Sequence, residues 1–347
     1  MKYYLALCCI IKDESYLEEF IIYHHLIGVE HFYIYDNESH IPICKRLDSF
    51  YYRNLCTIIN FPGKTMQMKA YKHCIDLVKN ITKWLAIIDG DEYIFPKTHN
   101  TIPEFLHGFD DCQSIGINWL VFGSSFHSKF QPGFSIDKYR YSALQQDRHV
   151  KCIVQPIHVK DINNPHFAIM KDCTKFMDPK HNIIEGPFND HITTDIIQLN
   201  HYTLRSYEDR VRKYHRGNAD SPDTRIYLCE SESDYHSVFN DIVNNDLPNK
   251  YLESIRSIHK ITGTNAEIYK SLNQDLKFNT IDEYYIHAFV YAFKETRPCH
   301  LTDKYPHFNR DIYRSNYSDL NHLDDLPLEL HYVYVGVHEN RICDRLL

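Results

Sequence analysis

The sequence predicts an α/β fold built on a parallel sheet, and three observations support this prediction. Within the first hundred residues, short apolar runs typical of strands alternate with segments in which apolar residues recur at helical spacing. Polar residues follow several of these runs directly, at the position where open α/β sheets bind ligands. The composition, with 43% hydrophobic and 24% charged residues in a chain of 347, is that of a globular protein with a sizeable core.

The first hundred residues contain a βαβ series. Tyr3 to Ile11 is a continuous apolar run, which is typical of a strand buried on both faces. A helix is expected over Asp13 to Leu26, where apolar residues have helical spacing and Gly28 follows as a terminator. The next expected elements are strands over His31–Tyr35, Cys56–Phe61 and Trp84–Ile88 and a helix over Met66–Val78.

Beyond Thr101 the alternation loosens, and from Arg205 to about Thr296 the helical period becomes dominant. Strands are expected over Ser114–Phe122, Cys152–Val159 and Ile196–Tyr202, and helices over Ser206–Tyr214, Ser233–Val243, Tyr251–Ile258 and Ile281–Phe293. The last forty residues, from Phe308, are expected to form a small helical module. We therefore expect an α/β domain over residues 1–220, a helical extension over 221–306 and a C-terminal module over 307–347.

The charge balance argues against a nucleic-acid partner. Lys and Arg number 38 against 46 for Asp and Glu, so the net charge is −8, and no run of five or more basic residues offsets it. No apolar stretch approaches the length of about 18 residues that would span a membrane. The opening segment is too short and too soon acidic for a signal peptide. We therefore expect a cytoplasmic protein, or a domain without its membrane anchor, and no membrane span within this chain.

The strongest local indication of chemistry is Asp89-Gly90-Asp91, which directly follows an expected strand. Two carboxylates separated by one small residue can hold a hard divalent cation, and such a cation stabilises a diphosphate as it leaves. Gly90 permits a tight bend and the close approach of a ligand. A solvated turn is the alternative, but Glu92 argues against it, because three crowded carboxylates repel each other unless a cation neutralises them.

A second indication is His201, at the end of the strand expected over Ile196–Tyr202. A neutral imidazole can complete a metal site formed by two acidic residues. Basic residues follow it, among them Arg205, Lys213 and Arg216, and such a cluster can meet phosphate oxygens. Because the chain has 23 histidines, a role at the surface or in the core is the alternative for His201.

Together these segments resemble the glycosyltransferase family 92 and the related family-2-like group. The resemblance covers about residues 1 to 220, and its motifs occur in the expected order. They are Cys8–Glu14, Leu17–Glu30, Phe32–Ser39, Trp84–Glu92, Trp119–Ser125, Lys151–Pro156, Pro165-His166 and Asn200–Tyr202, with Ser206, Lys213 and Gly217. It implies a GT-A fold, a Rossmann-like sheet that binds a nucleotide sugar, here with a helical C-terminal extension. It also implies a nucleotide-sugar donor, with a UDP-sugar preferred, and a divalent metal, Mn²⁺ or Mg²⁺.

The resemblance assigns roles to individual residues. Asp89, Asp91 and His201 become the metal ligands. The donor pocket is expected to include Ile11, Asp13, Glu14, Asp36, Gln67, Tyr71, Lys72, Asp89, Gly90, Trp119 and Lys213. A solvated helix face is the alternative for Gln67, Tyr71 and Lys72, and a core position is the alternative for Trp119.

The implied reaction is attack of an acceptor hydroxyl on the anomeric carbon of the donor, with inversion as the usual outcome. Inversion requires a base beside that hydroxyl, and we expect a carboxylate. Asp190 and Asp172 are the candidates, because they lie between the pocket strands and His201 in the sequence.

Two hypotheses about function remain open. The first is a metal-dependent glycosyltransferase that acts on a glycan or glycoconjugate. The second is a catalytically silent relative that binds a glycan or a nucleotide sugar as an assembly protein. The joint presence of Asp89, Asp91 and His201 favours the first hypothesis, because clustered acids without a cation destabilise a fold.

Overall fold

A computed structural model of the chain describes residues 1–47, 51–131, 133–216, 231–262, 266–279, 284, 297–298, 300–323 and 325–345. By its internal contacts the chain divides into two compact units, Met1–Glu253 and Ser254–Leu347. The boundary expected after residue 220 lies outside the described residues. The helix expected over Ile281–Phe293 also lies outside them, apart from Tyr284.

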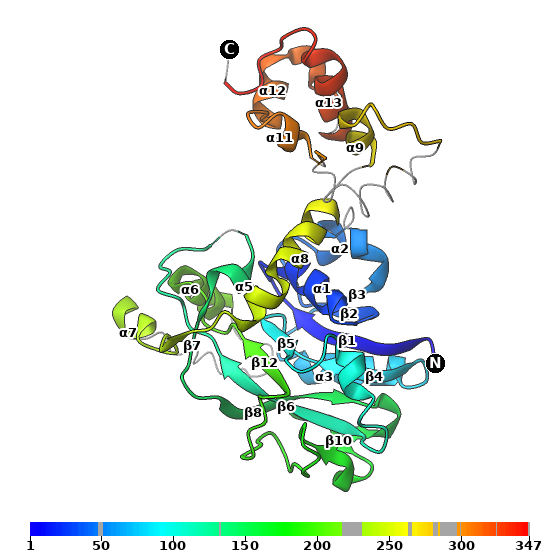
Figure 1. The fold of residues 1–347 in the computed structure, drawn as a ribbon, viewed down its shortest axis with the longest axis vertical. Coiled ribbons are helices and arrows are strands. Elements are labelled where there is room, and N and C mark those ends of the chain that lie inside the picture. Colours follow the sequence, from blue (N-terminus) through cyan, green and yellow to red (C-terminus); the bar gives the residue numbers. More distant parts are fainter. Residues whose placement is uncertain are drawn as a thin grey trace. The chain divides into compact units, whose positions relative to one another are not determined.

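Among the described residues, nine strands form one sheet at the centre of the first unit (Figure 1). Its strands are β1 (Tyr3–Ile11), β2 (His31–Asp36), β3 (Cys56–Asn60), β4 (Thr82–Ile87), β5 (Glu92–Pro96), β6 (Ser114–Val121), β8 (Asp147–Val154), β11 (Phe176–Met177) and β12 (Ile197–His201). The strand order is β3-β2-β1-β4-β8-β6-β12-β5, and β11 pairs with β6. Strands β3, β2, β1 and β4 are parallel to one another, whereas β8 and β5 are antiparallel to their neighbours. The predicted α/β fold with a Rossmann-like parallel section is therefore confirmed.

Short strands and helices complete the described chain. The strands are β7 (Tyr141–Ser142), β9 (Val159–Asp161), β10 (Ile169–Met170) and β13 (Ile242–Val243). The helices of the first unit are α1 (Leu17–Leu26), α2 (Ile43–Arg46), α3 (Gln67–Val78), α4 (Ile102–Leu106), α5 (Ser135–Lys138), α6 (Tyr207–Arg216) and α7 (Glu232–His236), and α8 (Asp246–Thr262) begins in it.

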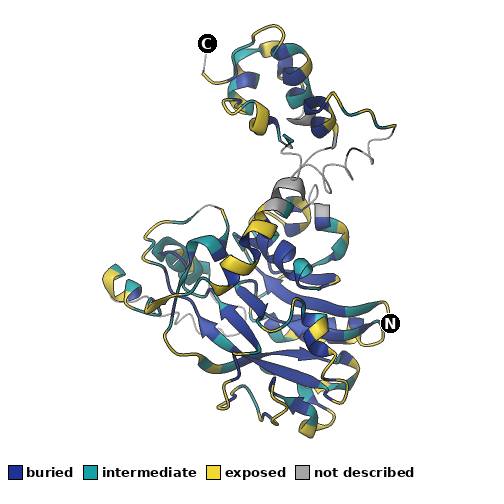
Figure 2. Ribbon diagram, in the orientation of Figure 1, coloured by how far each residue is buried: buried dark blue, intermediate teal, exposed yellow. Residues whose placement is uncertain are grey.

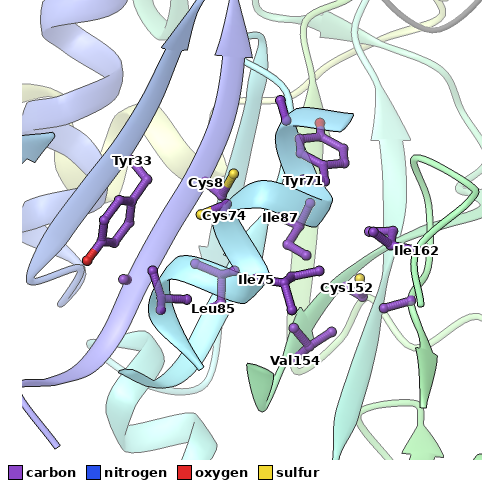
Figure 3. Close-up of a cluster of buried hydrophobic side chains, with 14 of the residues drawn as sticks. Cys8, Tyr33, Tyr71, Cys74, Ile75, Leu85, Ile87, Cys152, Val154 and Ile162 are labelled. Carbon is purple, nitrogen blue, oxygen red and sulfur yellow. The ribbon is translucent and has the colours of Figure 1, made fainter. Parts of the chain in front are cut away.

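Both faces of the parallel section are buried, which explains why β1 is apolar almost throughout. Along β1, Cys8 faces α3, and its neighbour Leu7, on the opposite face, is equally inaccessible at 0% exposure. Figure 3 shows Cys74 and Ile75 of α3 lying against Cys8 and against Ile87 of β4. Figure 2 shows that the strands of this sheet are buried along most of their length. This core fixes α3 beside the end of β4, where the site lies.

The sequence prediction was wrong at several elements, as the following three illustrate. It missed β5 (Glu92–Pro96), which begins immediately after Asp91. The strand expected over Cys152–Val159 is β8, Asp147–Val154, because its polar first half pairs with β6 although it lacks an apolar run. The helix expected over Ser233–Val243 ends at His236, and Ile242 and Val243 form β13 by pairing with β7.

The second unit is helical, as expected, and has a core of its own. Besides the C-terminal part of α8, its helices are α9 (Ala266–Leu272), α11 (Leu301–Lys304), α12 (Arg310–Asn316) and α13 (Asp325–His331). One cluster of buried side chains joins Leu272, Leu301, Tyr313 and Leu328, and it extends across the expected boundary at residue 306. In the described part of the chain, no helix combines the length and the apolar character that crossing a membrane requires.

Candidate active site

A cavity of about 260 Å³ lies at the carboxyl ends of β1 and β4. Many of the residues predicted from the sequence line it. They are Ile11, Glu14, Gln67, Asp89, Gly90, Asp91, Trp119, His201 and Lys213. The cavity is also lined by Lys12, Lys151, His166, Thr203 and Arg216, so that acids, cations and imidazoles share one small volume.

Strand pairing brings Asp91 and His201 together. Strands β12 and β5 run antiparallel, with His201 opposite Glu92, and the backbone N–H of Tyr202 donates to the carbonyl of Asp91 at 2.8 Å. As a result His201 Nε2 lies 3.6 Å from Asp91 Oδ1. The strand that the sequence prediction missed, β5, is therefore the element that places the histidine beside the acid.

Asp89 is held by neutral donors on one oxygen and by a buried lysine on the other. Its Oδ1 accepts hydrogen bonds from Gln67 Nε2 at 2.7 Å and from the Tyr71 hydroxyl at 2.9 Å. Its Oδ2 lies 2.7 Å from Lys151 Nζ, which is also 3.6 Å from Glu92 Oε2. Both oxygens of Asp89 are thus already satisfied by the protein.

The pKa shifts in this cluster follow from one cation placed between two acids. Burial would raise the pKa of Asp89, but the Lys151 ammonium outweighs it and the net pKa is lowered. Burial raises the pKa of Glu92 well above its usual range, and the more distant ammonium does not reverse this. Burial lowers the pKa of Lys151, yet Asp89 and Glu92 raise it further, so the lysine stays charged.

Asp91 is also paired with a cation, on the oxygen that does not face His201. Its Oδ2 lies 2.9 Å from Lys213 Nζ. Burial would raise the pKa of Asp91, but Lys213, His201 and Arg205 together lower it well below its usual range. The third acid of the cavity, Glu14, accepts from Arg205 Nη1 at 2.7 Å. The basic residues predicted to meet phosphate therefore lie among the acids of the cavity.

The predicted metal site of three side chains is not assembled. Within the described residues, no group of three or more His, Cys, Asp or Glu side chains is arranged to hold a metal. Asp89 does not fit the role of a ligand, because Lys151 occupies its second oxygen. Asp91 Oδ1 and His201 Nε2 do fit, since their separation of 3.6 Å is shorter than two metal–ligand bonds of about 2.1 Å each.

Aromatic rings form one wall of the cavity. The Trp119 ring centroid lies 4.4 Å from that of His201 and 5.0 Å from that of His166. On the same indole, His149 stacks at 5.1 Å, and its Nδ1 lies 2.6 Å from Asp147 Oδ1. A flat apolar face beside charged groups suits the ring of a sugar.

The remaining predicted residues lie away from this cavity. Tyr71 is fully buried behind Asp89, and Asp13 lines a second cavity of about 530 Å³ that shares Glu14, Asp91 and Lys213 with the first. Asp36 is buried, and its oxygens accept from the backbone N–H groups of Ser39 and Ile43.

Three further predicted residues are engaged at the surface. Lys72 pairs with Asp161 at 2.9 Å. Asp172 accepts from the backbone N–H of Thr174 and so caps a short helical turn, and Asp190 pairs with Arg148 at 3.0 Å. The structure therefore does not bring Asp172 or Asp190, the candidate bases, to the cavity.

Sequence reasoning did not select Lys151 or His166, although both lie in segments that carried the family resemblance. A lysine within the apolar run Val150–Val154 was the available indication, because a charged residue in a buried strand requires a partner. For His166 the sequence contains no comparable indication, since nothing distinguishes it from the other histidines.

Comparisons with known proteins identify the family of this chain. The model of the family described as Glycosyltransferase family 92 matches residues 5–253. A family 92 protein of Oryza sativa subsp. japonica is 26% identical over 213 residues, which are 59% of this chain and 34% of that protein. Another, from Arabidopsis thaliana, is 28% identical over 238 residues, 62% of this chain and 38% of that protein. The chain thus spans little more than a third of the length of these relatives. Among solved structures, S. aureus TarS 1–349 in complex with UDP has a TM-score of 0.30 and 13% identity over 45% of this chain and 47% of that chain.

Proposed function

Because this chain belongs to glycosyltransferase family 92, we propose that it moves a sugar from a nucleotide-diphosphate-sugar donor to a hydroxyl group of a glycan or glycoconjugate. The observation that carries the proposal is the pairing of Asp91 with His201, at 3.6 Å, in a cavity that cations also line. A diphosphate carries negative charge that grows as the sugar departs, and this cavity supplies the groups that can balance that charge.

We propose that two cations of helix α6 bind the diphosphate. Lys213 and Arg216 line the cavity, and the Lys213 side chain keeps 28% of its surface exposed although it pairs with Asp91. Both cations reach into the cavity from the same face of a single helix, three residues apart. In the donor complex we expect Lys213 to exchange part of its contact with Asp91 for a phosphate oxygen.

We propose that Mn²⁺ or Mg²⁺ assists the transfer, held by Asp91 Oδ1 and His201 Nε2. When bound, such a cation supplies Lewis-acid stabilisation of the departing diphosphate. Asp89 takes a different role in this proposal. Its carboxylate, fixed by Gln67, Tyr71 and Lys151, holds these side chains in place and so shapes the wall of the cavity.

Inversion at the anomeric carbon is the outcome we propose. Retention through a covalent intermediate would need a free nucleophilic carboxylate in the cavity. The acids that line its described part are Glu14, Asp89 and Asp91, and each is paired with a cation. A single attack by the acceptor hydroxyl on the face opposite the diphosphate requires no such nucleophile.

The experiment is a turnover screen with the full chain. A panel of nucleotide sugars, beginning with UDP-sugars, is incubated with glycan acceptors and Mn²⁺, and release of nucleoside diphosphate is measured with and without EDTA. We expect release with at least one donor, its loss in EDTA, and a product of inverted anomeric configuration by NMR. Binding of a donor without turnover by any acceptor would instead favour the silent assembly protein.

A further inference from the structure

Resting on the proposed function, the structure assigns the proton acceptor of the transfer to the Nε2 atom of His166. His166 lines the cavity that holds Asp91 and His201, and its ring centroid lies 5.0 Å from that of Trp119. The base of the reaction is therefore expected to be an imidazole of this wall and not a carboxylate.

The first argument is that each acid lining the described part of the cavity already forms an ion pair with a basic side chain. Among the described lining residues, Glu14 pairs with Arg205, Asp89 with Lys151 and Asp91 with Lys213. A carboxylate in a direct ion pair must give up that pairing to take a proton, whereas His166 is in no such ion pair among the described residues. The carboxylates expected from the sequence, Asp172 and Asp190, do not line the cavity.

The second argument is that the tautomer of His166 is fixed. Its Nδ1 lies 3.1 Å from the backbone carbonyl oxygen of Val150. A carbonyl oxygen only accepts, so Nδ1 must carry the proton and donate it. In the neutral ring the lone pair is then on Nε2, and among the described residues Nε2 has no hydrogen-bond partner.

The third argument is that the ring is neutral at physiological pH. Burial, followed by the positive charge of Lys151, lowers the pKa of His166 to about 4. The other charged groups that act on the ring are His149 and Asp89, of which the first lowers the pKa and the second raises it. A ring kept unprotonated in this way has its lone pair available when the substrate arrives.

The step balances in atoms and charge. The oxygen of the acceptor hydroxyl forms a bond to the anomeric carbon, and the bond between that carbon and the diphosphate oxygen breaks. Its electron pair leaves with the diphosphate. The hydroxyl proton passes to His166 Nε2, which turns the imidazole into an imidazolium that later returns the proton to water.

The test compares two substitutions of the same kind at histidines that contact a backbone carbonyl through Nδ1. His166→Asn keeps an N–H group that can donate to the Val150 carbonyl but removes Nε2. His25→Asn is the matched control, because His25 Nδ1 lies 2.9 Å from the backbone carbonyl oxygen of Val29 and His25 lines neither cavity. Each variant is assayed for sugar transfer with the donor and acceptor that the wild-type chain uses, and for UDP binding in the presence of Mn²⁺.

We expect His166→Asn to lower kcat by about 10²- to 10⁴-fold, the usual contribution of a general base, and to leave UDP binding unchanged. The loss should shrink with an acceptor analogue whose hydroxyl is made more acidic by neighbouring fluorine, since such a group needs less help from a base. His25→Asn should transfer at nearly the wild-type rate. A thermal unfolding curve for each variant shows that the fold is retained.

Transfer by His166→Asn at the wild-type rate would overturn the assignment while leaving the proposed function intact. A loss that is equally large with the acidic acceptor, or one matched by loss of UDP binding, would also overturn it, because His166 would then act in binding. Absence of transfer by the wild-type chain itself would instead remove the proposed function, so the two failures are distinguishable.

Discussion

Lys151 Nζ lies 2.7 Å from Asp89 Oδ2, and only 1% of the lysine side chain is exposed. This contact separates the tasks of two acids that adjoin the same glycine. Asp89 is fixed by the protein itself, whereas Asp91 faces His201 across a gap of 3.6 Å. In the Asp-Gly-Asp sequence, the first acid is thus held by Lys151, and the second acid faces His201 in the cavity.

Replacing Lys151 by Met should destabilise the fold by less than the roughly 3–5 kcal/mol typical of a fully buried pair, because it leaves the carboxylate of Asp89, which is 31% exposed, without its cation. Adding Asp89→Asn to the same chain should restore part of the loss. The free energy of unfolding in urea measures both effects.

Lys72→Met is the matched control for that substitution. Lys72 pairs with Asp161 at 2.9 Å, but 62% of its side chain is exposed, so water screens the pair and the change should leave the free energy of unfolding nearly unchanged. Equal losses for the buried and the exposed lysine would show that the Lys151–Asp89 pair does not stabilise the site.

Asp172→Asn and Asp190→Asn should leave the rate of sugar transfer unchanged. Both side chains are engaged at the surface, Asp172 with the backbone N–H of Thr174 and Asp190 with Arg148, and neither lines the cavity. The measurement is kcat and KM for transfer. A decrease in kcat of a hundredfold or more in either variant is the size expected when a general base is removed. It would indicate that the base is a carboxylate and not His166.

The buried His24 should make the fold less stable in acid. Its ring is 0% exposed, and burial lowers its pKa from 6.5 to about 3. Below pH 6.5, His24 therefore becomes protonated in the unfolded chain but stays neutral in the folded chain. The contribution of His24 to the free energy of unfolding is complete above pH 6.5. It should fall by about 1.4 kcal/mol for each pH unit as the pH decreases toward 3.

Urea unfolding of the wild type and of His24→Gln at pH 7.5 and 5.5 measures this contribution. Because His31 and His166 are present in both proteins, their own titrations cancel in the comparison. The variant should lose less stability between the two pH values than the wild type. Identical losses would mean that His24 already carries a proton in the folded chain.

Much of the fold could be predicted because its central strands are buried on both faces. The strand predicted over Tyr3–Ile11 is β1 with the same bounds, since an uninterrupted apolar run has few other uses in a chain of this composition. The positions of Asp89 and Asp91 could be predicted for the same reason, because both follow the apolar strand β4.

The rest depends on contacts between distant segments, which hydrophobic periodicity does not encode. The pairing of β4 with β8 brings Lys151 to Asp89. Because β8 begins with polar residues, its first half does not have the apolar run by which a buried strand is predicted. Asp36 could be placed at the end of β2, but its use as a cap for the backbone N–H groups of Ser39 and Ile43 depends on the path of the following loop.

The most direct test of the account is calorimetric titration of UDP into the full chain, with and without Mn²⁺, for the wild type, Asp91→Asn and the surface control Asp190→Asn. We predict that Mn²⁺ strengthens UDP binding to the wild type and to Asp190→Asn and has no effect on Asp91→Asn. Equal strengthening of all three by Mn²⁺, or no response of the wild type, would contradict the role of Asp91 at the centre of this site.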